Sequence, residues 1–292
     1  VGGRAYPFEQ FDLRYNRPDQ VIARLTPGSP LIKAYRELRQ QRLKRMGFDE
    51  KMLASDFHLP VVKLLNPPRS VATTQNQLRL HIQAQDTKYK LDRIMVYVND
   101  IPIHGQRGRD VRRHQAHTLQ QEESIPLTPG SNKIQISALN HAGTESLRET
   151  LQINYTGSTP RPTLHLISIG VSQYQQSQHN LEYAAKDAED MATQLASRHK
   201  NSHQISQYLW RNQAVTRNQI LALKSHLQRS RPEDRVILFL SGHGLLNADL
   251  HYYFAPYNMD FARPAQHGIT FEEIDYLLDG IPAREKLLLI DS

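Results

Sequence analysis

The chain has 292 residues, of which 39% are hydrophobic, and a formal net charge of +7 at pH 7. This length allows two domains, or one domain with extensions. No run approaches the roughly 18 apolar residues of a membrane span, so we expect none in this sequence. The absence of cysteine excludes disulfides and thiolate metal sites, and it fits a reducing compartment, so we expect a cytoplasmic protein.

The positive charge is concentrated in the first 162 residues, whereas the remainder is mildly acidic. A basic surface can bind nucleic acid or anionic lipid. The charges are scattered here and no nucleic-acid-binding motif accompanies them, so we interpret them as a solvated surface and expect no nucleic-acid partner. The start, Val1 to Arg4, lacks an initiator Met and a signal-peptide pattern, which predicts a piece of a longer protein.

Residues 1–58 predict a helical lead-in or linker. Asp19 to Leu25 is compatible with a short helix. A longer helix is indicated after Ser29, because Pro30 suits a first helical turn and Gly47 suits a stop. Its apolar stripe is expected to contain Leu31, Ala34, Tyr35, Leu38 and Leu43. The basic residues expected to face away from that stripe are Arg36, Arg39, Arg42, Lys44 and Arg45.

Residues 59–160 predict a small all-β domain. Alternating or fully apolar runs indicate strands at Leu78 to Ala84, Ile94 to Val98, Asn132 to Ala138 and Glu149 to Tyr155. Short strands at this spacing, separated by turn residues, favour an immunoglobulin-like sandwich without the usual disulfide. No catalytic pattern accompanies it, so we interpret it as a spacer or recognition module. The polar, Pro-containing segment 156–162 marks the boundary.

Residues 161–292 alternate strands and helices, which predicts an α/β domain with a mainly parallel sheet and helices on both faces. The expected strands are Leu164 to Val171, Ile205 to Trp210, Val236 to Leu240, His251 to Ala255 and Lys286 to Ile290. The expected helices are Glu182 to Ser197, one opened by the Thr216 to Gln219 capping pattern, and one from Thr270 through Leu278.

Two of these strands end in polar residues. Val236 to Leu240 is followed by Ser-Gly-His-Gly, and Lys286 to Ile290 is followed by Asp291 and Ser292. Ligands of open α/β sheets bind outside the carboxyl ends of the strands. His243, flanked by two glycines at such an end, is therefore a candidate general acid and base with space beside it for substrate backbone.

Four motifs in this region occur in the order and spacing of a known family. They lie at Leu166 to Val171, Leu181 to Ala188, Phe239 to Gly244 and Leu288 to Ser292. Together they resemble the caspase-like cysteine peptidases, and most closely the bacterial metacaspase-type branch. In that family a His-Gly pair ends one strand, and a strand that ends in Asp-Ser-Cys-His delivers the nucleophile.

The resemblance implies a role for four residues. His243 matches the general acid and base, and Gly244 matches the residue whose backbone N–H helps form the oxyanion hole. Asp187 and Asp291 match two positions that line the pocket for the substrate side chain before the cleaved bond. Two carboxylates in one pocket would select Arg or Lys rather than Asp through charge-assisted hydrogen bonds. The implied substrate is therefore a protein or peptide with a basic residue.

The resemblance also implies a cysteine directly after Ser292, beyond the sequence given. We expect the fragment as given to be inactive, and the remaining C-terminal part of the caspase-like domain to be its partner. The alternative is a non-catalytic caspase-fold binding or regulatory module. Calcium activation occurs in metacaspase relatives; the residues here neither support nor exclude it, and no other cofactor is expected. Phe11 to Pro18 and the β domain also resemble the parts that follow an upstream WD-repeat domain in large bacterial proteins.

Other chemistries are weakly indicated. His199 and His203 are four residues apart, but they straddle an expected turn and lack a carboxylate partner, so we expect no metal site. His165 lies inside a strand and is interpreted as a structural histidine. Ser241 and Ser292 raise the alternative of a serine hydrolase, but the Gly-x-Ser-x-Gly pattern of that class is absent.

Overall fold

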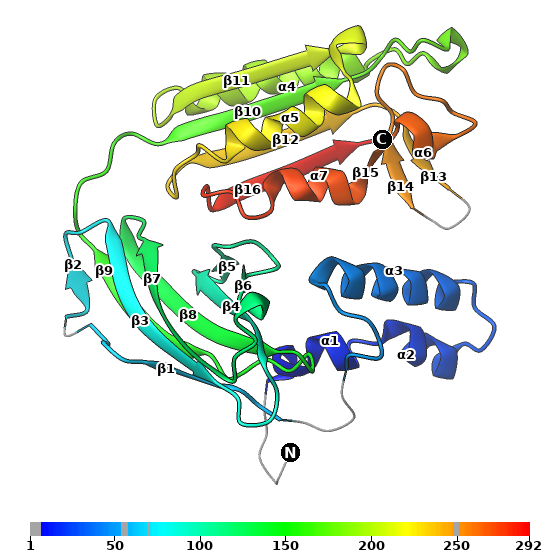
Figure 1. Cartoon of the computed structure of the whole chain (residues 1–292). Coiled ribbons are helices and arrows are strands. Elements are labelled where there is room, and N and C mark those ends of the chain that lie inside the picture. Colours follow the sequence, from blue (N-terminus) through cyan, green and yellow to red (C-terminus); the bar gives the residue numbers. More distant parts are fainter. Residues whose placement is uncertain (1–6, 54–57, 69, 248–250) are drawn as a thin grey trace. The chain divides into compact units, whose positions relative to one another are not determined.

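The computed structural model describes residues 7–53, 58–68, 70–247 and 251–292, so that Val1 to Arg4 lie outside the described residues. The chain divides into two compact units, Val1–Gly157 and Ser158–Ser292. The first unit contains the N-terminal helices and a β module, and the second is an α/β unit (Figure 1). No helix in the described part of the chain is long and apolar enough to cross a membrane.

The N-terminal segment is helical. Its elements are η1 (Phe8–Phe11), α1 (Asp12–Tyr15), α2 (Pro18–Leu25) and α3 (Leu31–Met46). Helix α3 stops at Gly47, whose φ of 73° is a conformation that glycine adopts without a steric penalty. The chain therefore turns at the residue that the sequence indicates.

The predicted apolar stripe of α3 is wrong in part. Leu31 and Leu38 are 49% and 51% exposed, whereas Arg39 is 4% exposed. The Nε atom of Arg39 lies 2.7 Å from Oε1 of Glu50. This charge-assisted pair compensates the buried guanidinium, an interaction that hydrophobic periodicity cannot indicate.

The β module consists of two sheets around one core. The first has the order β1-β3-β7, with β1 at Val61–Leu64, β3 at Gln77–Gln85 and β7 at Thr118–Pro126, all antiparallel. The second has the order β2-β9-β8-β4-β5, and β6 also pairs with β4. Its bounds are Ala72–Thr73 (β2), Leu91–Val98 (β4), Ile101–Pro102 (β5), Arg109–Asp110 (β6), Gly130–Asn140 (β8) and Glu149–Tyr155 (β9). A short helix, η2 (Arg112–His114), follows β6.

Alternation along the strands places one face of each sheet in this core. Ile82 in β3, Val96 in β4 and Ile134 in β8 are among its fully buried members. The turn between β4 and β5 is made by Asn99 and Asp100, both with positive φ, which suits a tight two-residue hairpin. Strand β7 was not among the strands predicted, because its inward positions include Gln121 and the buried Glu123, which interrupt the apolar alternation.

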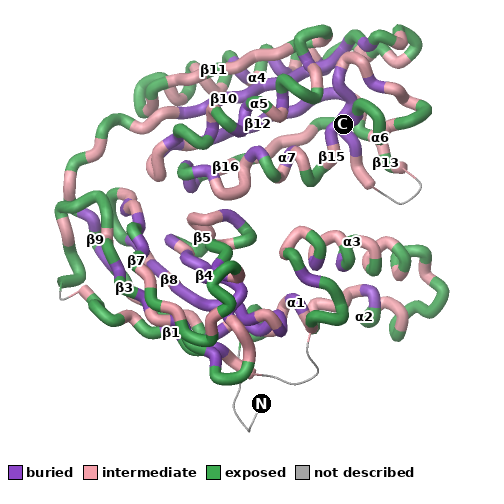
Figure 2. The backbone as a smooth tube through the Cα atoms, viewed as in Figure 1, coloured by how far each residue is buried: buried purple, intermediate pink, exposed green. Residues whose placement is uncertain are grey.

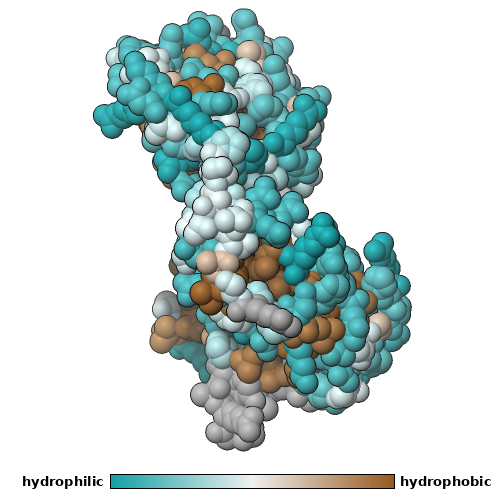
Figure 3. All heavy atoms as spheres, turned by 90° about the vertical axis from the view of Figure 1, so that its left-hand side faces the viewer, coloured by the Kyte–Doolittle hydropathy of each residue, from teal (hydrophilic) through white to brown (hydrophobic). Residues whose placement is uncertain are grey.

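The edges of this module carry exposed apolar residues. Val61 at the start of β1 and Leu65 just after its end are about half exposed, and Val71 before β2 is more so. Hydrophobic atoms are visible on the face of the first unit in Figure 3. Both β1 and β2 lie at the edge of their sheets among the described strands.

The second unit is built on a four-stranded parallel sheet with the order β11-β10-β12-β16. The strands are β10 (Thr163–Gly170), β11 (Gln204–Arg211), β12 (Arg235–Ser241) and β16 (Glu285–Asp291). Strands β10 and β12 are almost entirely buried, as Figure 2 shows. This confirms the prediction of an α/β fold with a parallel sheet.

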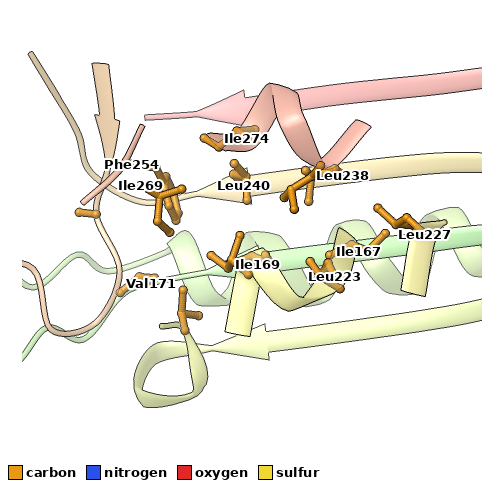
Figure 4. Close-up of a cluster of buried hydrophobic side chains, with 14 of the residues drawn as sticks. Ile167, Ile169, Val171, Leu223, Leu227, Leu238, Leu240, Phe254, Ile269 and Ile274 are labelled. Atoms are coloured by element: carbon orange, nitrogen blue, oxygen red, sulfur yellow. The ribbon is translucent and has the colours of Figure 1, made fainter. Parts of the chain in front are cut away.

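Helices cover both faces of this sheet. Helix α4 (Ala184–His199) packs on one face against Leu164, Leu166 and Ile237. Helices α5 (Arg217–Leu227) and α7 (Phe271–Leu278) contribute to the larger core on the other face, where Ile167, Ile169, Leu238 and Leu240 point (Figure 4). Thr270 caps α7 in a capping box with Glu273, as its sequence pattern indicates. Three short helices, η3 (Ser177–His179), η4 (Asn212–Ala214) and α6 (Pro264–His267), lie in connections.

One predicted strand belongs to a different sheet. The strand expected at His251 to Ala255 is β14 (Tyr252–Phe254), and it pairs antiparallel with β13 (Gly244–Leu246) and β15 (Ile269–Thr270). The segment between Ser241 and Tyr252 is too short for the crossover that a parallel strand requires, so the chain folds back on itself. This places β13 directly after the Ser-Gly-His motif.

Candidate active site

The two polar strand ends lie side by side. Strands β12 and β16 are parallel neighbours, and Ser241 is paired with Asp291 at their carboxyl ends. The backbone N–H of Gly242 donates a hydrogen bond to the carbonyl oxygen of Asp291 at 3.1 Å. The Ser-Gly-His-Gly and Asp-Ser motifs therefore share one edge of the sheet, although about 50 residues separate them in sequence.

A turn at Gly242 directs His243 out of the sheet. The φ of Gly242 is 154°, which a residue with a side chain rarely adopts, and a Cβ atom there would lie 3.0 Å from Oη of Tyr174. His243 then places its ring Nε2 atom 2.9 Å from the backbone carbonyl oxygen of His179. A carbonyl oxygen can only accept a hydrogen bond, so Nε2 carries a proton, and in the neutral imidazole Nδ1 is the nitrogen with the lone pair.

Three aromatic rings surround the His243 imidazole. Phe261 stands perpendicular to it at a centroid distance of 5.4 Å, and Tyr174 is tilted against it at 5.3 Å. The ring of His179 stacks on Phe261 at 3.8 Å. Burial raises the pKa of the Tyr174 hydroxyl to about 12, so this group stays neutral at any physiological pH.

Gly244 lies against the end of β16. A Cβ atom on Gly244 would be 2.6 Å from Oγ of Ser292 and 2.7 Å from the ring of Tyr252. The hydroxyl of Tyr252 donates a hydrogen bond to Oγ of Ser292 at 3.2 Å. The absence of a side chain at position 244 is therefore what allows the end of β16 to approach β13.

Asp187 and Asp291 line one groove of about 690 Å³ on the α4 face of the sheet. Asp187 lies in the first turn of α4, where the helix dipole favours a carboxylate, and Asp291 ends β16. Phe239 and Leu289 supply apolar walls, and Arg198 lines the groove as well. The structure brings together the two acids that the sequence nominates.

A third acid, Asp190, also lines this groove, but it forms an ion pair with Lys186 on the same helix. Asp187 lies almost one turn earlier on the same helix and lines the same groove. His243 is not among the groove-lining residues. The Gly242–Asp291 hydrogen bond connects the histidine turn to the strand end that carries Asp291.

The other nominated histidines lie elsewhere. Among the described residues there is no group of three or more His, Asp or Glu side chains that could hold a metal ion. His199 and His203 lie ring to edge at 5.5 Å in the turn after α4. His165 is buried, with Nε2 at 3.4 Å from a carboxylate oxygen of Asp234. This position inside the sheet is that of a structural group.

The sequence reasoning missed the groups that hold His243. The backbone carbonyl of His179, the hydroxyl of Tyr174 and the ring of Phe261 all contact it. Every residue has a backbone carbonyl, so the residue type at position 179 does not indicate this contact. Tyr174 follows the first strand of the α/β unit closely and could have been nominated, because loops at strand ends carry functional groups.

The second unit thus combines a parallel sheet, a histidine turn at one strand end and two acids in a neighbouring groove. A family model described as "Caspase domain" matches residues 165–292, the greater part of the second unit. Residues 165–292 therefore belong to the caspase domain family. This confirms the family resemblance that the four sequence motifs carry.

Comparison with solved structures gives distant similarities. Fibronectin(III)-like modules of CbhA from Clostridium thermocellum are 20% identical over 35% of this chain and 48% of theirs, with a TM-score of 0.27. A protein from Geobacter sulfurreducens is 19% identical over 44% of this chain and 49% of its own, with a TM-score of 0.35. The chain thus spans about half the length of these two proteins. No curated protein matches the chain.

Proposed function

We propose that the caspase-like domain is the catalytic part of a cysteine endopeptidase that cleaves peptide bonds after Arg or Lys. The observation that supports this most directly is the position of His243. Its Nε2–H is bound by the His179 carbonyl, and the residue closely follows β12 at the edge of the sheet where β16 ends. A base oriented by a second group, beside a strand end, is the arrangement that nucleophilic catalysis requires.

In this proposal the nucleophile is a cysteine directly after Ser292. His243 takes the thiol proton, and the thiolate attacks the carbonyl carbon of the substrate. As the C–N bond breaks, His243 gives the proton to the leaving amine and a thioester remains. Water, deprotonated by His243, then attacks the thioester and restores the thiol. The N–H of Gly244 stabilises the oxyanion in both steps.

Substrate selection is assigned to the acidic end of the groove. A guanidinium or ammonium group between Asp187 and Asp291 would form charge-assisted hydrogen bonds to both carboxylates. The apolar walls from Phe239 and Leu289 suit the methylene stem of Arg or Lys. A substrate Asp would be repelled by the same two acids.

The second candidate is a non-catalytic module that keeps the caspase fold and binds basic peptides. The same groove supports it, because binding needs the acids but no nucleophile. The residue after Ser292 discriminates the two: cysteine supports the peptidase, and any other residue supports the module.

The test uses the natural protein extended beyond Ser292 and peptides with Arg, Lys or Asp before the scissile bond. We expect cleavage after Arg and Lys, and loss of it in His243→Ala. The matched control is His267→Ala, because His267 is an exposed histidine of α6 in the same unit. Unimpaired cleavage by His243→Ala, or cleavage only after Asp, would overturn the proposal.

For the first unit we propose an immunoglobulin-like sandwich that acts as a spacer or recognition module. Its two sheets, ordered β1-β3-β7 and β2-β9-β8-β4-β5, support this reading, because a single core lies between them. An upstream WD-repeat domain, a bacterial origin and a cytoplasmic location belong to the same proposal. Expression of the extended protein, followed by fractionation, would test the location.

A further inference from the structure

The loop between β10 and α4 contacts His243 at two separate points. The hydroxyl of Tyr174 accepts a hydrogen bond from the backbone N–H of His243 at 2.9 Å, and the carbonyl of His179 binds the ring. One short segment, residues 172–181, therefore holds both the main chain and the side chain of this histidine.

This loop is itself fastened at several points. The N–H of Tyr174 donates to Oδ1 of Asn180 at 2.8 Å, which ties the two contact points to each other. The N–H of Leu181 donates to the carbonyl of Ser172, and Oγ of Ser172 accepts from the first turn of α4. The loop is thus braced across its base and joined to the helix that carries Asp187.

The side chain of Tyr174 is held in one position by packing, and its hydroxyl group stays neutral. Its side chain is 4% exposed and packs in the core of the sheet, edge to face with Phe261. A phenol held by packing of this kind presents its oxygen at one place, and a buried N–H left without an acceptor is unfavourable. Removing the oxygen would therefore release the main chain of His243 while leaving the ring of residue 174 in place.

We propose that Tyr174 is a positioning residue for the proposed reaction, acting through the backbone N–H of His243 so that the imidazole keeps its Nε2–H tautomer and its direction. Only the expected effect of Tyr174 on catalysis rests on the proposed function. The position and tautomer of His243 can be measured whether or not the chain cleaves a peptide.

The first experiment is NMR on the 292-residue chain with ¹⁵N-labelled histidine, assigned with His243→Ala. In Tyr174→Phe we expect the His243 amide to exchange at least about tenfold faster, and its ring nitrogens to move toward the average of the two tautomers. Tyr208→Phe is the matched control, because that hydroxyl contacts His226 in the same unit and not His243. Unchanged exchange and ring signals in a folded Tyr174→Phe would overturn the proposal.

A second variant separates the hydroxyl from the packing. Phe261→Leu removes an aromatic wall of His243 but keeps the Tyr174 oxygen, so the His243 amide should stay protected while its ring signals change. Equal loss of amide protection in both variants would show a packing effect and overturn the proposal. This variant also serves if Tyr174→Phe does not fold.

The kinetic experiment uses the extended protein. Tyr174→Phe should lower kcat about tenfold and change KM less than about twofold, because the substrate groove is untouched. An unchanged kcat would contradict the positioning role. Absence of cleavage by the parent protein itself would overturn the proposed function, and the NMR comparison would then decide the role of Tyr174 alone.

Discussion

Gly244 and Ser292 are in contact across the ends of two sheets. A methyl group on Gly244 would lie 2.6 Å from Oγ of Ser292, closer than real Cβ atoms approach any neighbour. Ser292 is also bound by the hydroxyl of Tyr252, so it is held from two sides. The contact connects the parallel sheet to the small antiparallel one.

Gly244→Ala should therefore displace the end of β16. Overpacking at such a contact costs about 1–3 kcal/mol, measured as a lower Tm and a lower free energy of unfolding. The double variant Gly244→Ala with Ser292→Gly should recover part of this loss, because it removes the opposing side chain. If the single variant is as stable as the parent, the close approach does not exist in solution.

Asp187→Asn should weaken selection of basic substrates by the extended protein. We expect kcat/KM for an Arg peptide to fall about ten- to hundredfold, because one charge-assisted pair is lost. Asp190→Asn is the control from the same helix and groove, since Lys186 already engages that carboxylate; a change below about threefold is expected. A larger effect from Asp190 than from Asp187 would contradict the assignment.

Asp234 should make the second unit sensitive to acid. Burial alone would raise the pKa of its carboxyl group, but hydrogen bonds from the N–H groups of Thr163 and Arg231 and from the Arg231 side chain outweigh this and hold the pKa below its ordinary 3.8. Because the folded pKa is the lower one, the stabilisation is complete above pH 3.8 and is lost as the pH falls through the folded value.

The corresponding variant is Asp234→Asn. At pH 7 it should lose about 1–3 kcal/mol in urea unfolding, and its stability should fall less steeply than that of the parent below about pH 4. Glu285→Gln is the control, because its side chain is 66% exposed and its ion pair with Arg235 should contribute less than about 1 kcal/mol. Identical acid profiles for parent and Asp234→Asn would refute this role.

Arg93→Met should destabilise the first unit. Arg93 is 2% exposed and bonds Asp92 and the carbonyl of Met46, so it joins β4 to the end of α3. Its removal leaves a fully buried carboxylate with less compensation, which costs about 3–5 kcal/mol. Calorimetry should show this loss, whereas the fluorescence of Trp210, the single tryptophan, should report an unchanged second unit. Arg79→Met, at an exposed position of β3, should have little effect.

The sequence predicted the elements of the second unit well, because its buried strands are continuous apolar runs that can be recognised in the sequence. Continuous apolar runs such as Val236 to Leu240 and capping patterns such as Thr270 with Glu273 depend on local chemistry alone. Asp187 and Asp291 line one groove, and the substrate-selecting role that the family resemblance implies for them stays a prediction.

Two features that the sequence did not indicate depend on long-range polar contacts. Arg39 is buried because Glu50 reaches it from beyond the helix, and His243 is held by a carbonyl 64 residues away. Neither contact produces a periodic pattern in the sequence from which it could be predicted. The antiparallel placement of β14 depended on the length of a connection rather than on the composition of the strand itself.

The acidic groove is assembled from residues that are far apart in the chain. Asp187 starts a helix near the beginning of the second unit, whereas Asp291 belongs to the last strand of the sheet. Loop closure over such a separation precedes any benefit from the contact, so the two carboxylates meet only after the intervening strands have formed. A nascent chain that has not yet formed β16 would lack this groove, so the recognition of basic peptides proposed above requires the folded domain.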